Sequence, residues 1–217
     1  MDIYLNKILK TLLIAFAVLF FYQSGGHAAY TADQPIEQIK STVDQAITIL
    51  NDDSLKGKDK HRVRQKQLFN LVDQRFNFQL MARLALGETW TTVDKNERRH
   101  FVELFSELLK NTYIRRVESY SGEQIVFTRQ IVKNNLALIF SKYEKNNQDF
   151  TINYKMQNNN GKWLVYDVVI EGVSVIKQYR RQFAQILQNE TMQGLIKRLD
   201  KKVKELVQAS DDEPVKS

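Results

Sequence analysis

Residues 124–171 read QIVFTRQIVKNNLALIFSKYEKNNQDFTINYKMQNNNGKWLVYDVVIE, and the predicted sheet lies in this stretch. Its β-branched and aromatic residues gather in four segments that are typical of strands, 124–132, 136–143, 150–156 and 162–171. The connections between these segments are short and polar. Because connections of this kind join antiparallel neighbours, the sequence predicts a four-stranded antiparallel meander.

The fourth of these segments is apolar on both of its alternating faces. Two apolar series interleave along it: Trp163, Val165 and Val169 on one side, and Leu164, Tyr166, Val168 and Ile170 on the other. The third segment, in contrast, alternates apolar and polar residues and keeps one face in water. The fourth strand is therefore expected to be covered from both sides.

Helical patterns flank the sheet on both sides in the sequence. Asp59, Asp94 and Thr191 are suitable N-caps, and Glu97 completes a capping box with Asp94. Helices before and after one contiguous sheet predict an α+β fold with about six helices. Apolar residues recur at helical spacing in 35–51, 60–75, 76–86, a longest helix that begins at Asp94, 176–187 and 192–207.

The first 28 residues have the pattern of a cleavable secretory signal peptide (1–28). Lys7 and Lys10 precede a short apolar run, and the small residues Gly26 and Ala28 occupy the positions that signal peptidases prefer. An uncleaved anchor is the alternative, but a membrane span needs roughly 20 apolar residues. We therefore expect export to the periplasm.

The rest of the chain contains no internal repeat and no linker rich in proline or glycine, so we expect one domain over 29–209 and a polar tail over 210–217. The formal charge of the chain is +7. Basic residues crowd the last helix, which is typical of a solvated face but also permits transient contact with an anionic membrane surface. These residues are Lys197, Arg198, Lys201, Lys202 and Lys204.

Composition excludes several classes of protein. The chain has no cysteine, so disulfides, thiolate metal sites and cysteine nucleophiles are absent. His61 and His100 have no further ligands at metal-binding spacing, and no phosphate-binding or dinucleotide motif occurs. A platform of interleaved arginines and aromatics for nucleic acid is also missing. We expect no cofactor, no metal site and no nucleic-acid partner.

Asp167 and Glu171 are the best catalytic candidates. A carboxylate that faces an apolar cavity can act as a general base, which allows a cone-shaped isomerase or hydratase. The alternative is structural, because Arg180 and Arg181 follow closely enough to form ion pairs with both carboxylates. We favour the structural interpretation and expect the protein not to be an enzyme.

Several motifs resemble the MlaC family of periplasmic phospholipid-binding proteins, also called the toluene-tolerance auxiliary component. Asn77 is a departure, because the family commonly has Asp between the two Phe residues of the first motif. The resemblance runs in order through the whole chain after the signal peptide. The motifs are Phe76-Asn77-Phe78-x-x-Met81-Ala82, Leu86-Gly87-x-x-Trp90, Phe101-x-x-x-Phe105-x-x-Leu108-Leu109-x-x-x-Tyr113, Trp163-Leu164-Val165-Tyr166-Asp167-Val168-x-Ile170-Glu171-Gly172-Val173-Ser174 and Tyr179-Arg180-x-Gln182-Phe183.

The resemblance implies an NTF2-like fold, in which a curved sheet and its helices enclose an apolar pocket for acyl chains. It also implies a soluble carrier of a two-chain phospholipid in the pathway that maintains outer-membrane lipid asymmetry. The implied partners are an outer-membrane lipoprotein complex and an inner-membrane ABC transporter with an MCE-domain subunit. A related branch is associated with hopanoid lipids, which leaves the lipid class open.

We predict that fourteen residues line the lipid site. Tyr179 and Arg180 are expected near the mouth, where the arginine fork suits a phosphate. Each apolar residue in the set is also compatible with an ordinary filled core, in which case the protein is an adaptor without a ligand. The set is Phe76, Phe78, Met81, Leu84, Phe105, Leu109, Tyr113, Val165, Val169, Val173, Ile176, Tyr179, Arg180 and Phe183.

Overall fold

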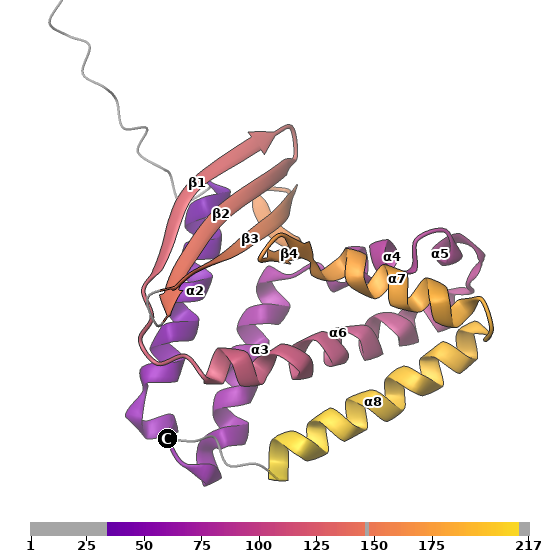
Figure 1. Ribbon diagram of the computed structural model, residues 1–217, viewed down its shortest axis with the longest axis horizontal. Coiled ribbons are helices and arrows are strands. Elements are labelled where there is room, and N and C mark those ends of the chain that lie inside the picture. The colour runs from indigo at the N-terminus through magenta and orange to yellow at the C-terminus, as the bar shows by residue number, and fades with distance from the viewer. Residues whose placement is uncertain (1–33, 146–147, 213–217) are drawn as a thin grey trace, which may run out of the picture. The chain divides into compact units, whose positions relative to one another are not determined.

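The computed structural model describes residues 34–145 and 148–212 (Figure 1). The predicted signal peptide and the last five residues of the predicted tail lie outside this range. Among the described residues, no helix combines the length and the hydropathy that a membrane span requires. The helices are α2 (Pro35–Asn51), α3 (His61–Arg75), α4 (Phe78–Leu86), α5 (Thr89–Thr92), α6 (Lys95–Glu118), α7 (Val175–Leu187) and α8 (Met192–Asp212).

The sheet is an antiparallel meander in the order β1-β2-β3-β4-β5. The α+β prediction is confirmed, but the sheet has five strands where four were predicted. The additional strand forms because Glu171 and Gly172 take positive φ angles of 48° and 77° and turn the chain back on itself. The strands are β1 (Ile125–Lys133), β2 (Leu136–Lys145), β3 (Gln148–Asn159), β4 (Lys162–Ile170) and β5 (Val173–Ser174).

The helix prediction was close to the structure in number and bounds. The described residues form seven helices, one more than about six, because the short helix α5 gave no periodic signal. Asp94 caps α6 as predicted and accepts hydrogen bonds from the N–H groups of Asn96 and Glu97. Asp59 does not cap α3, because it lies within the 3-10 turn Lys58–Lys60.

A β-bulge in β4 corrects the predicted faces of that strand. Val165 pairs with Met156, whereas Asp167 pairs with the adjacent Lys155, so Tyr166 is an extra residue. Beyond the bulge the alternation is therefore shifted by one position. The prediction that Val165 and Val169 share a face was wrong, and Val168 takes the place that Val169 was expected to occupy.

Two hydrophobic cores meet at this strand, and Phe76 and Val168 pack against both of them. The sheet core joins α2 to the inner face of the sheet and contains Ile36, Ile39, Ala137, Ile139, Tyr154, Met156, Trp163 and Val165. The helical core joins α4, α6, α7 and α8. In Figure 1, α2 runs along the sheet, α6 crosses α3, and α8 packs along α6 away from the sheet.

Arg75, the last residue of α3, ties three elements of the sheet core together. Its guanidinium donates hydrogen bonds to Thr42 Oγ1 at 3.0 Å, to Gln38 Oε1 at 2.6 Å and to the carbonyl of Trp163 at 2.7 Å. Gln38 Oε1 also accepts from the N–H of Trp163 at 3.0 Å. These directional contacts fix α2, α3 and β4 relative to one another.

Candidate functional site

Most of the predicted lining residues meet in the helical core. Five of them are buried there, and five more are half-buried and pack against it from its edge. Val165 instead lies in the sheet core and is fully buried. The buried five are Met81, Phe105, Leu109, Ile176 and Phe183, and the half-buried five are Phe76, Phe78, Leu84, Tyr113 and Tyr179.

Aromatic rings organise the centre of this cluster. The ring of Phe105 meets Tyr179 edge-on at a centroid distance of 5.2 Å and Phe183 at 5.5 Å. Phe101 stacks on Phe105 at 5.6 Å. Edge-to-face and offset contacts of this kind are favourable, but they are less directional than hydrogen bonds. The centre of the helical core is thus held by apolar contacts between α6 and α7.

The boundary between the two cores is apolar and half-buried. Phe76 and Val168 each pack against both cores, while Tyr166 and Ile170 of β4 pack against the helical core from the same region. We call these four residues the seam. The N–H of Asn77 donates to the carbonyl of Val165 at 2.8 Å and anchors the start of α4 beside it. The seam is the place where helices and sheet face each other with apolar side chains.

Three of the seam residues were missing from the predicted site. Tyr166, Val168 and Ile170 were recognised as an apolar series, but Val165 and Val169 were chosen because strict alternation placed them together. The bulge at Tyr166 breaks that alternation. Nothing in the local sequence marks Tyr166 as a bulge. The available signal was the second apolar series of the strand, which contains Tyr166, Val168 and Ile170.

Two tyrosines bring polar atoms to the edge of the helical core. The hydroxyl of Tyr179 forms a hydrogen bond with that of Thr112, and burial raises its pKa above the ordinary value. Burial also raises the pKa of Tyr113, and the guanidinium of Arg116, 5.8 Å from the centroid of this ring, opposes the shift. Both hydroxyls stay neutral at physiological pH and can donate a hydrogen bond.

Arg180 lies against Gly87, at the end of α4. A Cβ atom at Gly87 would come within 2.9 Å of the guanidinium nitrogens of Arg180. Gly87 also has a φ of 60° and a ψ of −127°, which side chains disfavour. Arg180 therefore packs on the backbone that follows α4, while its side chain remains exposed.

The two candidate catalytic carboxylates are both committed to structural contacts. Asp167 is buried and accepts from Lys155 Nζ at 2.8 Å, from Ser174 Oγ at 2.7 Å and from the N–H of Ile176 at 3.2 Å. Glu171 is exposed and accepts hydrogen bonds from both the N–H and the hydroxyl of Thr151. The expected ion pairs with arginine were wrong for both residues, because Lys155 and Thr151 occupy the partner positions.

Val169 and Val173 lie apart from the other predicted residues. Both line a hollow of about 420 Å³ on the outer side of the sheet, together with Leu138 and Lys155. The side chain of Val173 is 50% exposed. These two valines therefore do not join the seam.

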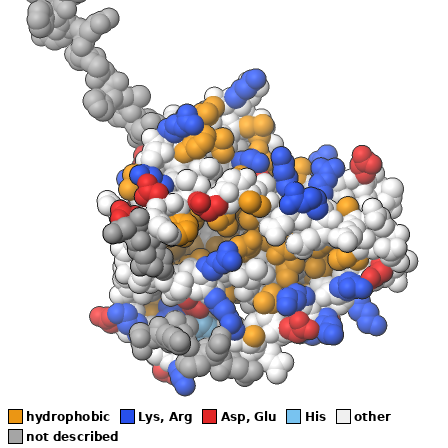
Figure 2. Space-filling view, in the orientation of Figure 1, with side chains coloured by type: hydrophobic (Ala, Val, Ile, Leu, Met, Phe, Trp, Pro, Cys, Tyr) orange, Lys and Arg blue, Asp and Glu red, His pale blue; other side chains and the backbone are white. Residues whose placement is uncertain are grey.

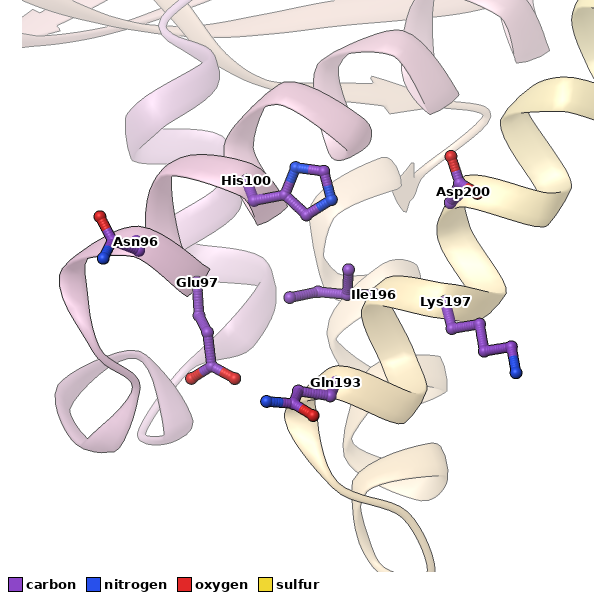
Figure 3. A pocket seen from close by; sticks show the side chains of 7 residues that line it. All are labelled: Asn96, Glu97, His100, Gln193, Ile196, Lys197 and Asp200. Atoms are coloured by element: carbon purple, nitrogen blue, oxygen red, sulfur yellow. The ribbon is translucent and has the colours of Figure 1, made fainter.

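A second hollow of about 410 Å³ lies between the start of α6 and α8 (Figure 3). Ile196 points into the space between the helices, Glu97 and His100 face it from α6, and Lys197 points away. This hollow has a mixed-charge rim and contains none of the predicted site residues. Across the described ranges, no cluster of three or more His, Asp or Glu side chains has the arrangement of a metal site.

The family model "MlaC protein" matches residues 40–201. An aligned segment of 129 residues is 25% identical to the intermembrane phospholipid transport system binding protein MlaC of Haemophilus influenzae. That alignment covers 57% of this chain and 60% of the relative, so the match spans less than two thirds of the relative's length.

A solved structure has a similar fold. The phospholipid-binding protein from Ralstonia solanacearum, solved in complex with a phospholipid, superimposes with a TM-score of 0.70 at 22% sequence identity. The superposition covers 80% of this chain and 99% of that structure. At this level of identity the likeness establishes the fold.

Proposed function

The chain belongs to the MlaC family, and from that premise we propose that it is a phospholipid carrier of the periplasm that holds acyl chains at the seam. The predicted signal peptide (1–28) delivers the chain there, and the carrier exchanges lipid with an outer-membrane lipoprotein complex and an inner-membrane ABC transporter that has an MCE-domain subunit. The similar Ralstonia protein is described with a bound phospholipid, which supports this class of ligand.

The observation that carries the proposal is the apolar seam between two separate cores. Phe76 and Val168 contact both cores, so a ligand that separates helices from sheet at this point would meet apolar side chains on both walls. The helical wall consists of aromatic and aliphatic contacts, so a movement of its side chains breaks no hydrogen bond between them. The sheet wall is held in place by Arg75.

Acyl chains require an enclosed site of this kind. Each methylene left in water costs about 0.8 kcal/mol, so four exposed methylenes cost about 3 kcal/mol, or more than a hundredfold in affinity. A shuttle must therefore cover most of both tails. Tyr113, Tyr179 and Arg180 lie at the edge of the helical core, where they are suited to contact a polar headgroup.

Catalysis is the less favoured alternative. An isomerase or hydratase would need a carboxylate that is free to titrate in an open cavity, whereas Asp167 and Glu171 each already accept several hydrogen bonds. We therefore assign no catalytic role to either residue. A hopanoid remains the alternative lipid, since it would fill the same apolar walls.

Native mass spectrometry of the protein purified after periplasmic expression tests the proposal. We expect a bound species whose mass and fragments identify a two-chain phospholipid. A hopanoid in its place would correct the lipid class. A protein that carries no lipid, and takes none from phosphatidylethanolamine vesicles, would disprove the carrier function.

Two substitutions of valine by aspartate test whether lipid binds at the seam or elsewhere on the sheet. Val168→Asp places a carboxylate on the seam, and we expect loss of most co-purifying lipid because a charge against acyl chains is strongly unfavourable. The matched control is Val126→Asp on β1, where the side chain is 39% exposed, and it should retain lipid. If Val168→Asp fails to fold, Val168→Phe narrows the seam without a charge and should lower the amount of bound lipid. Equal lipid content in the seam and control variants would show that lipid binds elsewhere.

A further inference from the structure

The outer face of the sheet carries apolar side chains, and no helix of the described residues covers them. Opposite the face that packs on α2, cross-strand pairing places Ile131 next to Leu138 and Asn153 next to Val169. Ile131 is 49% exposed. Figure 2 shows hydrophobic side chains over the strands, with lysines and arginines around them. Apolar patches with a polar rim are typical of interaction surfaces.

A recess lies at the end of this face, next to the start of α7. It has a volume of about 420 Å³, which is large enough for an aliphatic side chain. Leu138, Val169 and Val173 supply its apolar residues, and Lys177 and Arg181 border it from α7. No acidic residue is among those that line it.

The positive charge of the recess is only partly neutralised. Lys155 is paired with Asp167, whose side chain is 5% exposed. Lys177 and Arg181 lie one helical turn apart, and within the described ranges neither side chain has an ion-pair or hydrogen-bond partner. Two unpaired cations therefore stand beside an apolar floor.

The same buried carboxylate anchors the start of the helix that carries these cations. Asp167 accepts from Ser174 Oγ and from the N–H of Ile176, and Ser174 Oγ accepts from the N–H of Lys177. The first turn of α7 is thus attached to β4, so the backbone that carries Lys177 is fixed beside the apolar floor. A preorganised surface of this kind loses less conformational entropy on binding.

We infer that this recess is a docking site for an acidic segment of a partner protein, which inserts an aliphatic side chain between Leu138 and Val169 and places carboxylates on Lys177 and Arg181. Charge complementarity carries the choice of an acidic occupant. The concave shape favours a protruding protein side chain over a membrane surface. The inference does not depend on the cargo, because the recess and the seam lie on opposite sides of β4.

A labelled peptide tests the inference directly. The probe is a ten-residue peptide that alternates aspartate with leucine, and the control peptide has asparagine in place of aspartate. We expect fluorescence anisotropy to detect binding of the acidic peptide only, with an affinity that falls as salt is added. The protein is the full chain after periplasmic expression, with its lipid content measured in parallel.

Charge reversal locates the binding surface. The double variant Lys177→Glu/Arg181→Glu should weaken peptide binding by about tenfold or more. The matched control, Lys197→Glu/Lys201→Glu, makes the same change of charge at the same spacing on α8 and should leave the affinity within about twofold. Both variants should keep their lipid, so a failure of the docking inference is distinguishable from a failure of the carrier function.

Three results would overturn the inference. The first is the absence of binding by the acidic peptide, and the second is an equal loss of affinity in both double variants, which would indicate a general attraction to positive charge. The third uses vesicles of equal parts phosphatidylcholine and phosphatidylglycerol. If the vesicles bind through Lys177 and Arg181 while the peptide does not, the partner is a membrane surface and not a protein.

Discussion

The two cores of this protein are held together by different kinds of contact. In the sheet core, Arg75 donates three hydrogen bonds across α2, α3 and β4, and Ser141 hydrogen-bonds the buried Tyr154. In the helical core, rings such as Phe105, Tyr179 and Phe183 meet through apolar surfaces. Hydrogen bonds fix geometry, whereas apolar contacts tolerate rearrangement. The sheet core therefore serves as a frame with fixed geometry, and the helical core serves as an apolar wall without such hydrogen bonds.

The largest expected effect is in the helical core. Phe105→Ala removes a fully buried ring that contacts Phe101, Tyr179 and Phe183. We expect the free energy of unfolding to fall by about 3–5 kcal/mol, measured by urea denaturation. Phe105→Leu, which leaves a smaller cavity, should cost less. A loss below about 1 kcal/mol for the alanine variant would show that the helical core has no fixed packing.

Alkaline pH should lower the free energy of unfolding through Tyr154, a buried residue of the sheet core. Burial raises the pKa of Tyr154 to about 12, while its hydrogen bond with Ser141 opposes the shift. In the unfolded chain a tyrosine ionises near pH 10, so the unfolded state loses this proton first. Stability is therefore retained below pH 10 and is lost between about pH 10 and pH 12, by about 2–3 kcal/mol.

Tyrosine-to-phenylalanine variants measure the contribution of Tyr154 to the free energy of unfolding. The difference in unfolding free energy between the parent and Tyr154→Phe should shrink as the pH rises from 9 to 12. Tyr179→Phe is the comparison in the helical core, and its half-buried hydroxyl should give a smaller change. The same dependence on pH in both variants would remove this distinction between the cores.

Removal of the Arg75 side chain should destabilise the sheet core. Arg75→Ala removes the hydrogen bonds that the guanidinium donates to Thr42, Gln38 and the carbonyl of Trp163, and we expect the free energy of unfolding to fall by about 2 kcal/mol. Hydrogen exchange should increase in α2 and β4 more than in α6. Arg83→Ala is the control, because Arg83 is an exposed arginine of α4. Faster exchange in α6 alone would contradict the assignment of Arg75 to the sheet core.

The smallest expected effect lies at the junction of the cores. Ser174 caps α7 by accepting from the N–H of Lys177 at 3.0 Å and donates to Asp167 at 2.7 Å. Ser174→Ala should lower the free energy of unfolding by about 1 kcal/mol, and Ser174→Thr should recover most of it. Thermal unfolding measures both variants. If threonine fails to restore stability, the hydroxyl contacts are not the cause.

Local patterns predicted the helices better than the two faces of β4. The bounds of α2 and the Asp94 cap follow from spacing and residue type, because these signals act within one or two helical turns. The side of β4 that faces the helices depends on an extra residue at Tyr166, which is defined only by pairing with β3. The partner of Asp167 was missed for the same reason, since Lys155 lies on that neighbouring strand.

Predicting the seam required knowledge of contacts between distant segments. Phe76 stands at the start of α4, yet it reaches β4 by pairing with Val165. The sequence marked Phe76 as apolar, but apolar character is shared by residues that only fill a core. The family resemblance supplied the expectation of a pocket, and the structure supplied the boundary between two cores where such a pocket can open.

The position of Arg180 over Gly87 limits how this protein can vary. Two separate obstacles exclude a side chain at Gly87, namely the backbone angles of that residue and the guanidinium nitrogens 2.9 Å from its would-be Cβ. A change of Arg180 removes only the second obstacle. Replacement of the arginine therefore opens no new choice at position 87, because the backbone angles there still require glycine.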